Sequence, residues 1–142
     1  MADSISLRNQ ISTLRQSFFD EGMLDKHFVQ LEELEEENPH FAEEVMTMFF
    51  RDSTKLIATV EHALQTSPYD LPQIDQYLHQ LKGSSSSVGA AKVWSEINKL
   101  RALLKDGEME RFWTQFFQVK NEHDKLKENL GPYFQMLRQL DP

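Results

Sequence analysis

His79, Lys82 and Gly83 are the residues whose types and spacing best suit chemistry, and they stand in the segment HQLKGSSSSVGA. Near neutral pH an imidazole is partly uncharged and can attack an activated phosphoryl group. Lys82 follows His79 by about one helical turn, so its ammonium can bind phosphoryl oxygens carried by the ring. The spacing predicts a residue that accepts a phosphoryl group and a cation that stabilises it.

The helix expected to start after the cap Asp70 turns these residues toward solvent. At about 100° per residue, its apolar positions cluster and define the buried direction. These positions are Leu71, Ile74, Leu78 and Leu81. His79 lies roughly 120° from that direction and Gly83 roughly 160°, so both are expected on the outer side of the helix.

Other residues share that outer side with His79. Asp75, Gln76 and Ser86 flank the same stripe, so a molecule that approaches the imidazole would meet them. Ser85 falls on the inward direction, where its small side chain would allow close approach of a neighbouring helix. Its hydroxyl could equally bond back to a carbonyl of its own helix.

Gly83 is an unusual choice for a helix that faces solvent. Glycine costs about 1 kcal/mol relative to alanine inside a helix. The absence of a side chain one turn after His79 leaves space beside the ring, so we interpret Gly83 as a residue that provides clearance. Two alternatives stay open: residues 83–87 could be a fraying helix end, and His79 could be an ordinary solvated histidine.

The fold class expected from the whole chain is all-α. Apolar residues recur at helical spacing, and no segment shows sustained period-two alternation. Residues 1–37 are expected to form two shorter helices that pack across one end of the remainder. Residues 38–142 are expected to form four helices with short connections, which favour an antiparallel up-down bundle. We expect residues 1–142 to be one domain.

The helix boundaries and buried positions can also be predicted. Asn38 is expected to cap the first bundle helix, with Pro39 at its first position. SVGA and KDGE are expected to end the second and third bundle helices. The residues expected to face the core, besides those of the His79 helix, are Leu7, Ile11, Leu14, Phe18, Leu24, Phe28, Leu31, in part Leu34, Phe41, Val45, Met48, Phe49, Leu56, Val60, Leu64, Val93, Trp94, Ile97, Leu100, Leu104, Phe112, Trp113, Phe116, His123, Leu126, Leu130, Phe134 and Leu137.

Composition limits the possible functions. The chain has 142 residues, no cysteine and a formal net charge of -8. The acidic balance argues against nucleic-acid binding, because phosphate backbones are held by basic surfaces. No apolar run reaches membrane-spanning length, and the first residues do not resemble a signal peptide. We expect a cytoplasmic and nuclear protein, acting as a monomer, whose partners are other proteins.

Other sites with known sequence patterns fit poorly. GSSSSVGA lacks the glycine spacing and the lysine of a phosphate-binding loop, and it lacks the G-x-S-x-G pattern of a serine nucleophile. A di-metal bundle needs two Glu-x-x-His pairs, whereas Glu37 and His40 form a single such spacing interrupted by Pro39. No metal site is therefore expected. His123 lies on an apolar stripe and is best interpreted as a hydrogen-bonded core histidine.

HQLKGSSSSVGA resembles the signature of histidine-containing phosphotransfer (HPt) proteins, in which histidine is followed by any residue, leucine, lysine and glycine. The extra N-terminal helices and the segment PYFQMLRQL resemble the plant members, carriers of cytokinin-type multistep phosphorelays. The resemblance spans essentially the whole chain. It differs after Gly89, where AAKVWSEINKLRALL is more apolar, and at the aromatic RFWTQFF, which leaves partner specificity open.

The resemblance implies roles for single residues. His79 would be the phosphoacceptor, and Lys82 would steady the phosphoryl group. Gly83, with Asp75, Gln76 and Ser86 of the outer stripe, would meet the docking receiver domain. Some plant relatives have asparagine in place of the histidine and cannot carry phosphate, whereas this chain retains it.

The resemblance also implies partners and a mode of action. Receiver domains of hybrid histidine kinases would donate the phosphoryl group, and those of response regulators would accept it. Mg²⁺ would belong to the receiver, and the chain itself would need no cofactor. The carrier would not be an enzyme: kinase dimerisation domains have an acidic residue after the histidine, whereas Gln80 stands here. A helical adaptor that binds proteins without carrying phosphate is the alternative.

Overall fold

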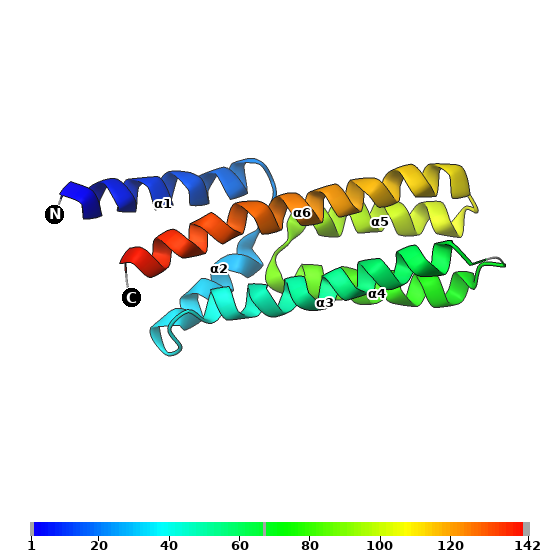
Figure 1. Ribbon diagram of the computed structural model, residues 1–142, viewed down its shortest axis with the longest axis horizontal. Coiled ribbons are helices and arrows are strands. Elements are labelled where there is room, and N and C mark those ends of the chain that lie inside the picture. Colours follow the sequence, from blue (N-terminus) through cyan, green and yellow to red (C-terminus); the bar gives the residue numbers. More distant parts are fainter. Residues whose placement is uncertain (1, 67, 141–142) are drawn as a thin grey trace.

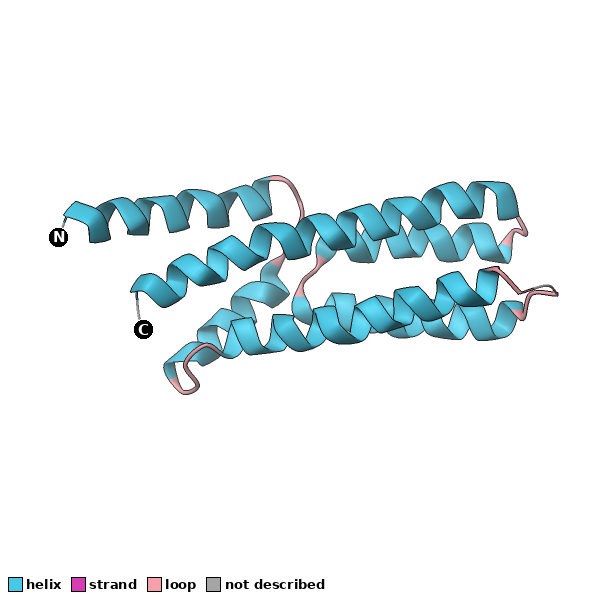
Figure 2. Cartoon of the chain, viewed as in Figure 1, coloured by secondary structure: helices cyan, strands magenta, loops and turns pink. Residues whose placement is uncertain are grey.

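The computed structural model describes residues 2–66 and 68–140, which form helices joined by turns and contain no strand (Figures 1 and 2). The elements are α1 (Ala2–Asp20), α2 (Lys26–Glu33), a 3₁₀ turn η1 (Leu34–Glu36), α3 (Phe41–Leu64), α4 (Leu71–Val88), α5 (Ala91–Lys105) and α6 (Met109–Leu140). The predicted all-α class is confirmed. None of these helices is both long and apolar enough to cross a lipid bilayer.

Helices α3 to α6 form the predicted antiparallel up-down bundle. Each packs against the next along the chain, and α3 also contacts α6, which closes the bundle. Helix α1 lies along the C-terminal half of α6, and α2 packs against α3 and α4 at the same end (Figure 1). Both additional N-terminal helices thus lie at one end, as predicted, but α1 runs along α6 and does not cross the end of the bundle. The opposite half of α4, which begins at Leu71, is free of them.

One apolar core connects all six helices. Its fully buried side chains include Phe18, Phe28, Met46, Ile74, Leu78, Leu81, Ile97, Phe112, Phe116 and Tyr133. Four predicted core positions are wrong, because Leu34, Met48, Leu71 and Trp94 are 47%, 53%, 38% and 38% exposed. Met46 and Phe50 are buried on α3 in place of Met48, since the helix is rotated so that they lie toward α6.

The start of α3 also differs from the prediction. The helix begins at Phe41, after His40 adopts a left-handed conformation with φ 65°. Asn38 is not the cap; its carbonyl instead accepts a hydrogen bond from the Phe41 N–H at 3.1 Å, forming a turn before the helix. The Glu35 carboxylate accepts from the Ala42 N–H at 3.4 Å, so an acidic side chain seven residues away supplies the capping contact.

Gly89 ends α4 and sets the direction of α5. It has φ 78°, a left-handed conformation that glycine adopts without a Cβ clash. A Cβ at this position would lie 2.5 Å from the Phe28 nitrogen of α2, and the Gly89 carbonyl accepts from the Asp25 N–H at 3.0 Å. The tight turn makes α4 and α5 antiparallel neighbours, so residues of α5 lie beside the outer stripe of α4.

Candidate functional site

Helix α4 is continuous through the glycine and the four serines that follow His79. Its cap is Asp70, as predicted, because the side chain accepts a hydrogen bond from the Gln73 N–H at 3.1 Å. The helix then runs to Val88. The alternative that residues 83–87 are a frayed helix end is therefore wrong.

Three of the four serines either use their hydroxyls inside the helix or face the core. Ser84 donates to the Leu81 carbonyl at 3.2 Å, and Ser87 donates to the Gly83 carbonyl at 3.0 Å. These bonds satisfy hydroxyls that would otherwise compete with the helix. Ser85 is fully buried, as predicted, and its Oγ has no hydrogen-bond partner in the described part of the chain. Its contribution is its small size.

His79 and Gly83 both lie on the exposed side of α4, in agreement with the helical wheel. A Cβ placed on Gly83 would meet no heavy atom within 4 Å, apart from the backbone of its own helix and its chain neighbours. Open space therefore lies directly beside the imidazole, one turn along the helix. An incoming group can reach the ring without displacing any side chain at position 83.

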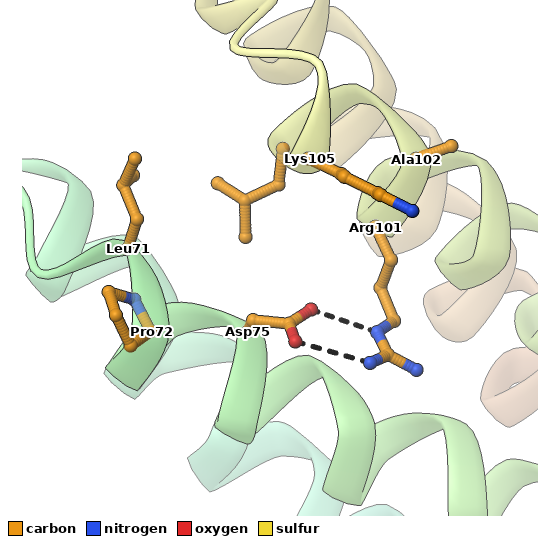
Figure 3. A pocket seen from close by; sticks show the side chains of 7 residues that line it. Leu71, Pro72, Asp75, Arg101, Ala102 and Lys105 are labelled. Carbon is orange, nitrogen blue, oxygen red and sulfur yellow. Dashed lines mark hydrogen bonds and ion pairs between the residues drawn. The ribbon is translucent and has the colours of Figure 1, made fainter.

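Arg101 of α5 is the residue of this site that the sequence did not reveal. Its Nε donates to Oδ1 of Asp75 at 2.9 Å and its Nη2 donates to Oδ2 at 3.2 Å, a two-point ion pair between α5 and α4 (Figure 3). The Nη1 atom lies 3.5 Å from Nδ1 of His79. Arg101 thus approaches the ring at Nδ1 and leaves Nε2 as the nitrogen available to an incoming group.

The ion pair changes the titration of both partners. The hydrogen bond from Arg101 holds the pKa of the Asp75 carboxyl below its ordinary value, against the opposing effect of partial burial. The same hydrogen bond raises the pKa of Arg101. Asp75 stays ionised and fixes the guanidinium next to His79. The predicted docking residue Asp75 therefore does not stand free in solvent, because it is bound to α5.

The remaining predicted site residues lie along the same side of α4. Gln76 is exposed, and Lys82 and Ser86 are half-buried toward α5. Within residues 2–66 and 68–140, Lys82 forms no ion pair, so its charge remains available to a phosphoryl group. The helix thus presents His79, Gln76 and Gly83 outward, and it places Lys82 and Ser86 at the border with α5.

A shallow pocket continues this surface toward the start of α4. It is lined by Leu71, Pro72, Asp75, Arg101, Ala102, Leu104 and Lys105, so the ion pair forms one of its walls (Figure 3). No group of three His, Cys, Asp or Glu side chains that could hold a metal ion occurs in the described segments. The chemistry that this surface offers is an exposed imidazole flanked by cations.

His123 lies away from this surface, in the core. It is 3% exposed, and its Nε2 lies 2.6 Å from the hydroxyl of Ser53 on α3. The rings of Phe49 and Phe50 pack against it. The prediction of a hydrogen-bonded core histidine is confirmed, and burial lowers the pKa of this imidazole.

Comparison with known proteins identifies the family. The Hpt domain model matches residues 44–129. Histidine-containing phosphotransfer protein 4 of Arabidopsis thaliana is 42% identical over 116 residues, which cover 81% of this chain and 91% of that protein. Pseudo histidine-containing phosphotransfer protein 5 of Oryza sativa subsp. japonica is 42% identical over 138 residues, which cover 96% and 91%.

Solved structures agree with these relationships. A histidine-containing phosphotransfer protein from Medicago truncatula superposes with a TM-score of 0.90 at 36% identity, covering 94% of this chain and 92% of that one. The maize protein gives a TM-score of 0.89 at 34% identity, covering 95% and 99%. The similarity extends over sequence and fold alike, and the chain therefore belongs to the family of plant histidine-containing phosphotransfer proteins.

Proposed function

We propose that this protein is a phosphorelay carrier in which His79 accepts a phosphoryl group from the receiver domain of a hybrid sensor histidine kinase. It then passes the group to the receiver aspartate of a response regulator. The observation that supports this most strongly is the exposed imidazole of His79 beside the open space at Gly83. A family that transfers phosphoryl groups supplies the general chemistry.

The transfer step needs few groups from this chain. The Nε2 lone pair of His79 attacks phosphorus in line, the Nε2–P bond forms, and the bond from phosphorus to the receiver aspartate breaks, so that a carboxylate leaves. Mg²⁺ held by the receiver offsets charge on the phosphoryl oxygens. Lys82 of the carrier binds those oxygens once they are on the ring. Both linkages are high in energy, so transfer runs in either direction.

Arg101 adds a second cation to this proposal. It lies on the Nδ1 side of the ring, with its Nη1 atom 3.5 Å from Nδ1, so it does not block the approach to Nε2. Its ion pair with Asp75 keeps the guanidinium in place without a partner protein. We further propose that the carrier acts without a nucleotide or a kinase activity of its own, and that it works in cytokinin-type signalling in the cytoplasm and nucleus.

The test uses a purified receiver domain charged with labelled phosphate. The wild-type chain should gain an acid-labile, base-stable label, and His79→Gln should gain none. His62→Gln is the matched control, because His62 is another exposed histidine, at the end of α3. It should be labelled like the wild type. Label that persists on His79→Gln would refute the assignment of the phosphoacceptor.

A non-phosphorylated adaptor is the second candidate function. Three relatives from Oryza sativa subsp. japonica, at 41% to 43% identity, are named pseudo histidine-containing phosphotransfer proteins, which keeps this second function open for the chain. The adaptor function predicts that His79→Gln leaves receiver binding unchanged and that the wild type acquires no label. The same labelling experiment therefore distinguishes the two functions.

A further inference from the structure

Trp94 is a large aromatic side chain left exposed on the same surface as His79. Leu71 and Trp94 are the two large apolar residues of α4 and α5 that are more than a third exposed, each at 38%. An indole in a protein usually buries much of its surface. Exposed Trp94 can take part in the proposed transfer only if it lies close enough to His79 to contact the same docked partner.

The helical register places Trp94 beside the phosphoacceptor. It precedes Arg101 by seven residues on α5, so the two side chains leave the helix about 20° apart on one stripe. Arg101 contacts Asp75 and His79 of α4, hence that stripe faces the outer edge of α4. Because α4 and α5 are antiparallel around the turn at Gly89, Trp94 lies level with residues 83–86.

The distance from His79 falls within the footprint of a docked protein. Five residues of helical rise are about 8 Å, and neighbouring helix axes are about 8–10 Å apart. The Cα atoms of His79 and Trp94 are therefore separated by about 12 Å. A standard interface covers about 800 Å² on each partner, a disc of about 16 Å radius. A protein domain centred on His79 covers Trp94.

Nothing in the described part of the chain gives the Trp94 ring a stacking partner. The other tryptophan, Trp113, packs edge-on against Phe116 and lies near Phe117. Trp94 takes part in no such aromatic pair and in no cation–π contact within residues 2–66 and 68–140. No aromatic or cationic side chain of the described residues covers its exposed part, so that part is free for a partner.

The charge around Trp94 indicates the kind of partner. Helices α4 and α5 contain five cationic residues and two anionic ones, although the whole chain has a formal charge of -8. Three of the cations, Lys82, Arg101 and Lys105, lie on the side that carries His79. Lys99 pairs with Glu96 and lines a pocket beside α6, and Lys92 bonds to the Glu21 carbonyl. A complementary surface is acidic. A receiver that carries an aspartyl phosphate and a divalent cation has this property, because such cations are held by carboxylates.

We propose that Trp94 is a docking anchor by which this carrier selects among receiver domains. The indole contacts an apolar recess that adjoins the acidic phosphoacceptor site of the preferred receivers. Receivers with a charged or filled surface at that point bind more weakly. This inference rests on the proposed function of His79, and it adds the residue that determines which partners are served.

Affinity measurements with a panel of purified receiver domains test the selection. Trp94→Ala should weaken the tightest receiver about 30-fold and the weakest ones little, so that the ranking of receivers is compressed. Phe117→Ala is the matched control. Phe117 is 51% exposed and adjoins Lys120, which pairs with Glu61 of α3, so it lies on the opposite side of the bundle. Its loss should change affinity less than twofold.

Fluorescence tests the contact itself. In a Trp113→Phe protein, Trp94 is the single indole. Binding of the tightest receiver should shift its emission to shorter wavelength and protect it from acrylamide. Unchanged emission, or an equal affinity loss for every receiver after Trp94→Ala, overturns the inference.

Labelling separates this inference from the proposed function. If receivers label His79 in the wild type and Trp94→Ala leaves the affinity ranking intact, the carrier function stands and the anchor is wrong. If no receiver labels the wild type, the proposed function is wrong, and the inference that Trp94 selects receivers is wrong as well. Circular dichroism melting of Trp94→Ala and Phe117→Ala verifies that both variants are folded.

Discussion

Arg101 of α5 forms a two-point ion pair with Asp75 of α4 and places a third guanidinium nitrogen 3.5 Å from Nδ1 of His79. The pair joins two helices across the proposed transfer surface. Asp75 and His79 are one turn apart on α4, so one arginine contacts both. The guanidinium is thus held in place before any partner binds, and its position relative to the ring has consequences that can be measured.

The lifetime of phosphohistidine should depend on Arg101. Its guanidinium lies beside the ring that would carry the phosphoryl group, so it places a positive charge near the negative phosphoryl oxygens. Arg101→Ala should shorten the lifetime by up to about fivefold, because an exposed charge contact contributes at most about 1 kcal/mol. The rate of label loss, followed from about pH 6 to about pH 8, measures the effect.

The comparison with Arg101→Lys makes that experiment specific. Lysine keeps a charge near the ring but cannot form the two-point pair with Asp75. Its lifetime should lie between those of the wild type and Arg101→Ala. If the three proteins lose label at one rate throughout the pH range, Arg101 has a purely structural role.

Gly83 should show opposite effects on stability and transfer. A Cβ there meets no neighbouring atom, so Gly83→Ala and Gly83→Gln should each stabilise α4, by up to about 1 kcal/mol. The thermal midpoint should rise by a few degrees. Gly83→Gln fills the space beside His79 and should slow transfer from a receiver at least about tenfold, a loss of about 1.4 kcal/mol. Wild-type transfer rates in Gly83→Gln would contradict the clearance role.

Stability should fall in mildly acidic solution because of His123. Burial lowers the pKa of this imidazole in the folded state, so below about pH 6.5 the unfolded chain binds a proton that the folded chain does not. The contribution is fully present above that pH and is lost as the pH falls toward the folded-state pKa. Urea unfolding between about pH 5 and pH 8 measures this, and the free energy of unfolding should fall more steeply with falling pH in the wild type than in His123→Met.

Ser53 should matter to the same buried pair at all pH values. Its hydroxyl lies 2.6 Å from Nε2 of His123, and both side chains are buried. Ser53→Ala should cost about 1–3 kcal/mol, because the ring nitrogen is then buried without a partner. Thr54→Ala, at an exposed neighbouring position, is the control and should be nearly neutral in the same unfolding experiment.

Gly89 should tolerate no side chain. Its φ of 78° is unfavourable for other residues, and a Cβ would lie 2.5 Å from the backbone nitrogen of Phe28, which cannot move aside as a flexible side chain can. Gly107→Ala is the matched control, since Gly107 has φ 72° but open surroundings. We expect a cost of about 1–2 kcal/mol for Gly107→Ala and at least twice that for Gly89→Ala in denaturant unfolding. Equal losses of unfolding free energy in the two variants would show that the clash between the new Cβ and the Phe28 nitrogen is relieved.

Local rules explain why much of this protein is readable from its sequence. The Asp70 cap, the end of α4 at Gly89 and the exposure of His79 follow from side-chain chemistry and a period of 3.6 residues within one helix. The HPt signature adds the family. These features can be predicted without knowing how a neighbouring helix packs, so the sequence was sufficient to predict them.

The contacts between helices were decided by the tertiary structure. Arg101 reaches Asp75 and His79 because α5 turns back along α4 in a particular register. Met46 is buried in place of Met48 because of the particular rotation of α3 about its own axis. The face of α3 that contains Met48 and the face that contains Met46 are both apolar enough to be buried. Rotation and register are settled by how side chains of several helices interlock, so they depend on residues far apart in the chain. The sequence determined which helices form and where the histidine stands; packing determined which residues surround it.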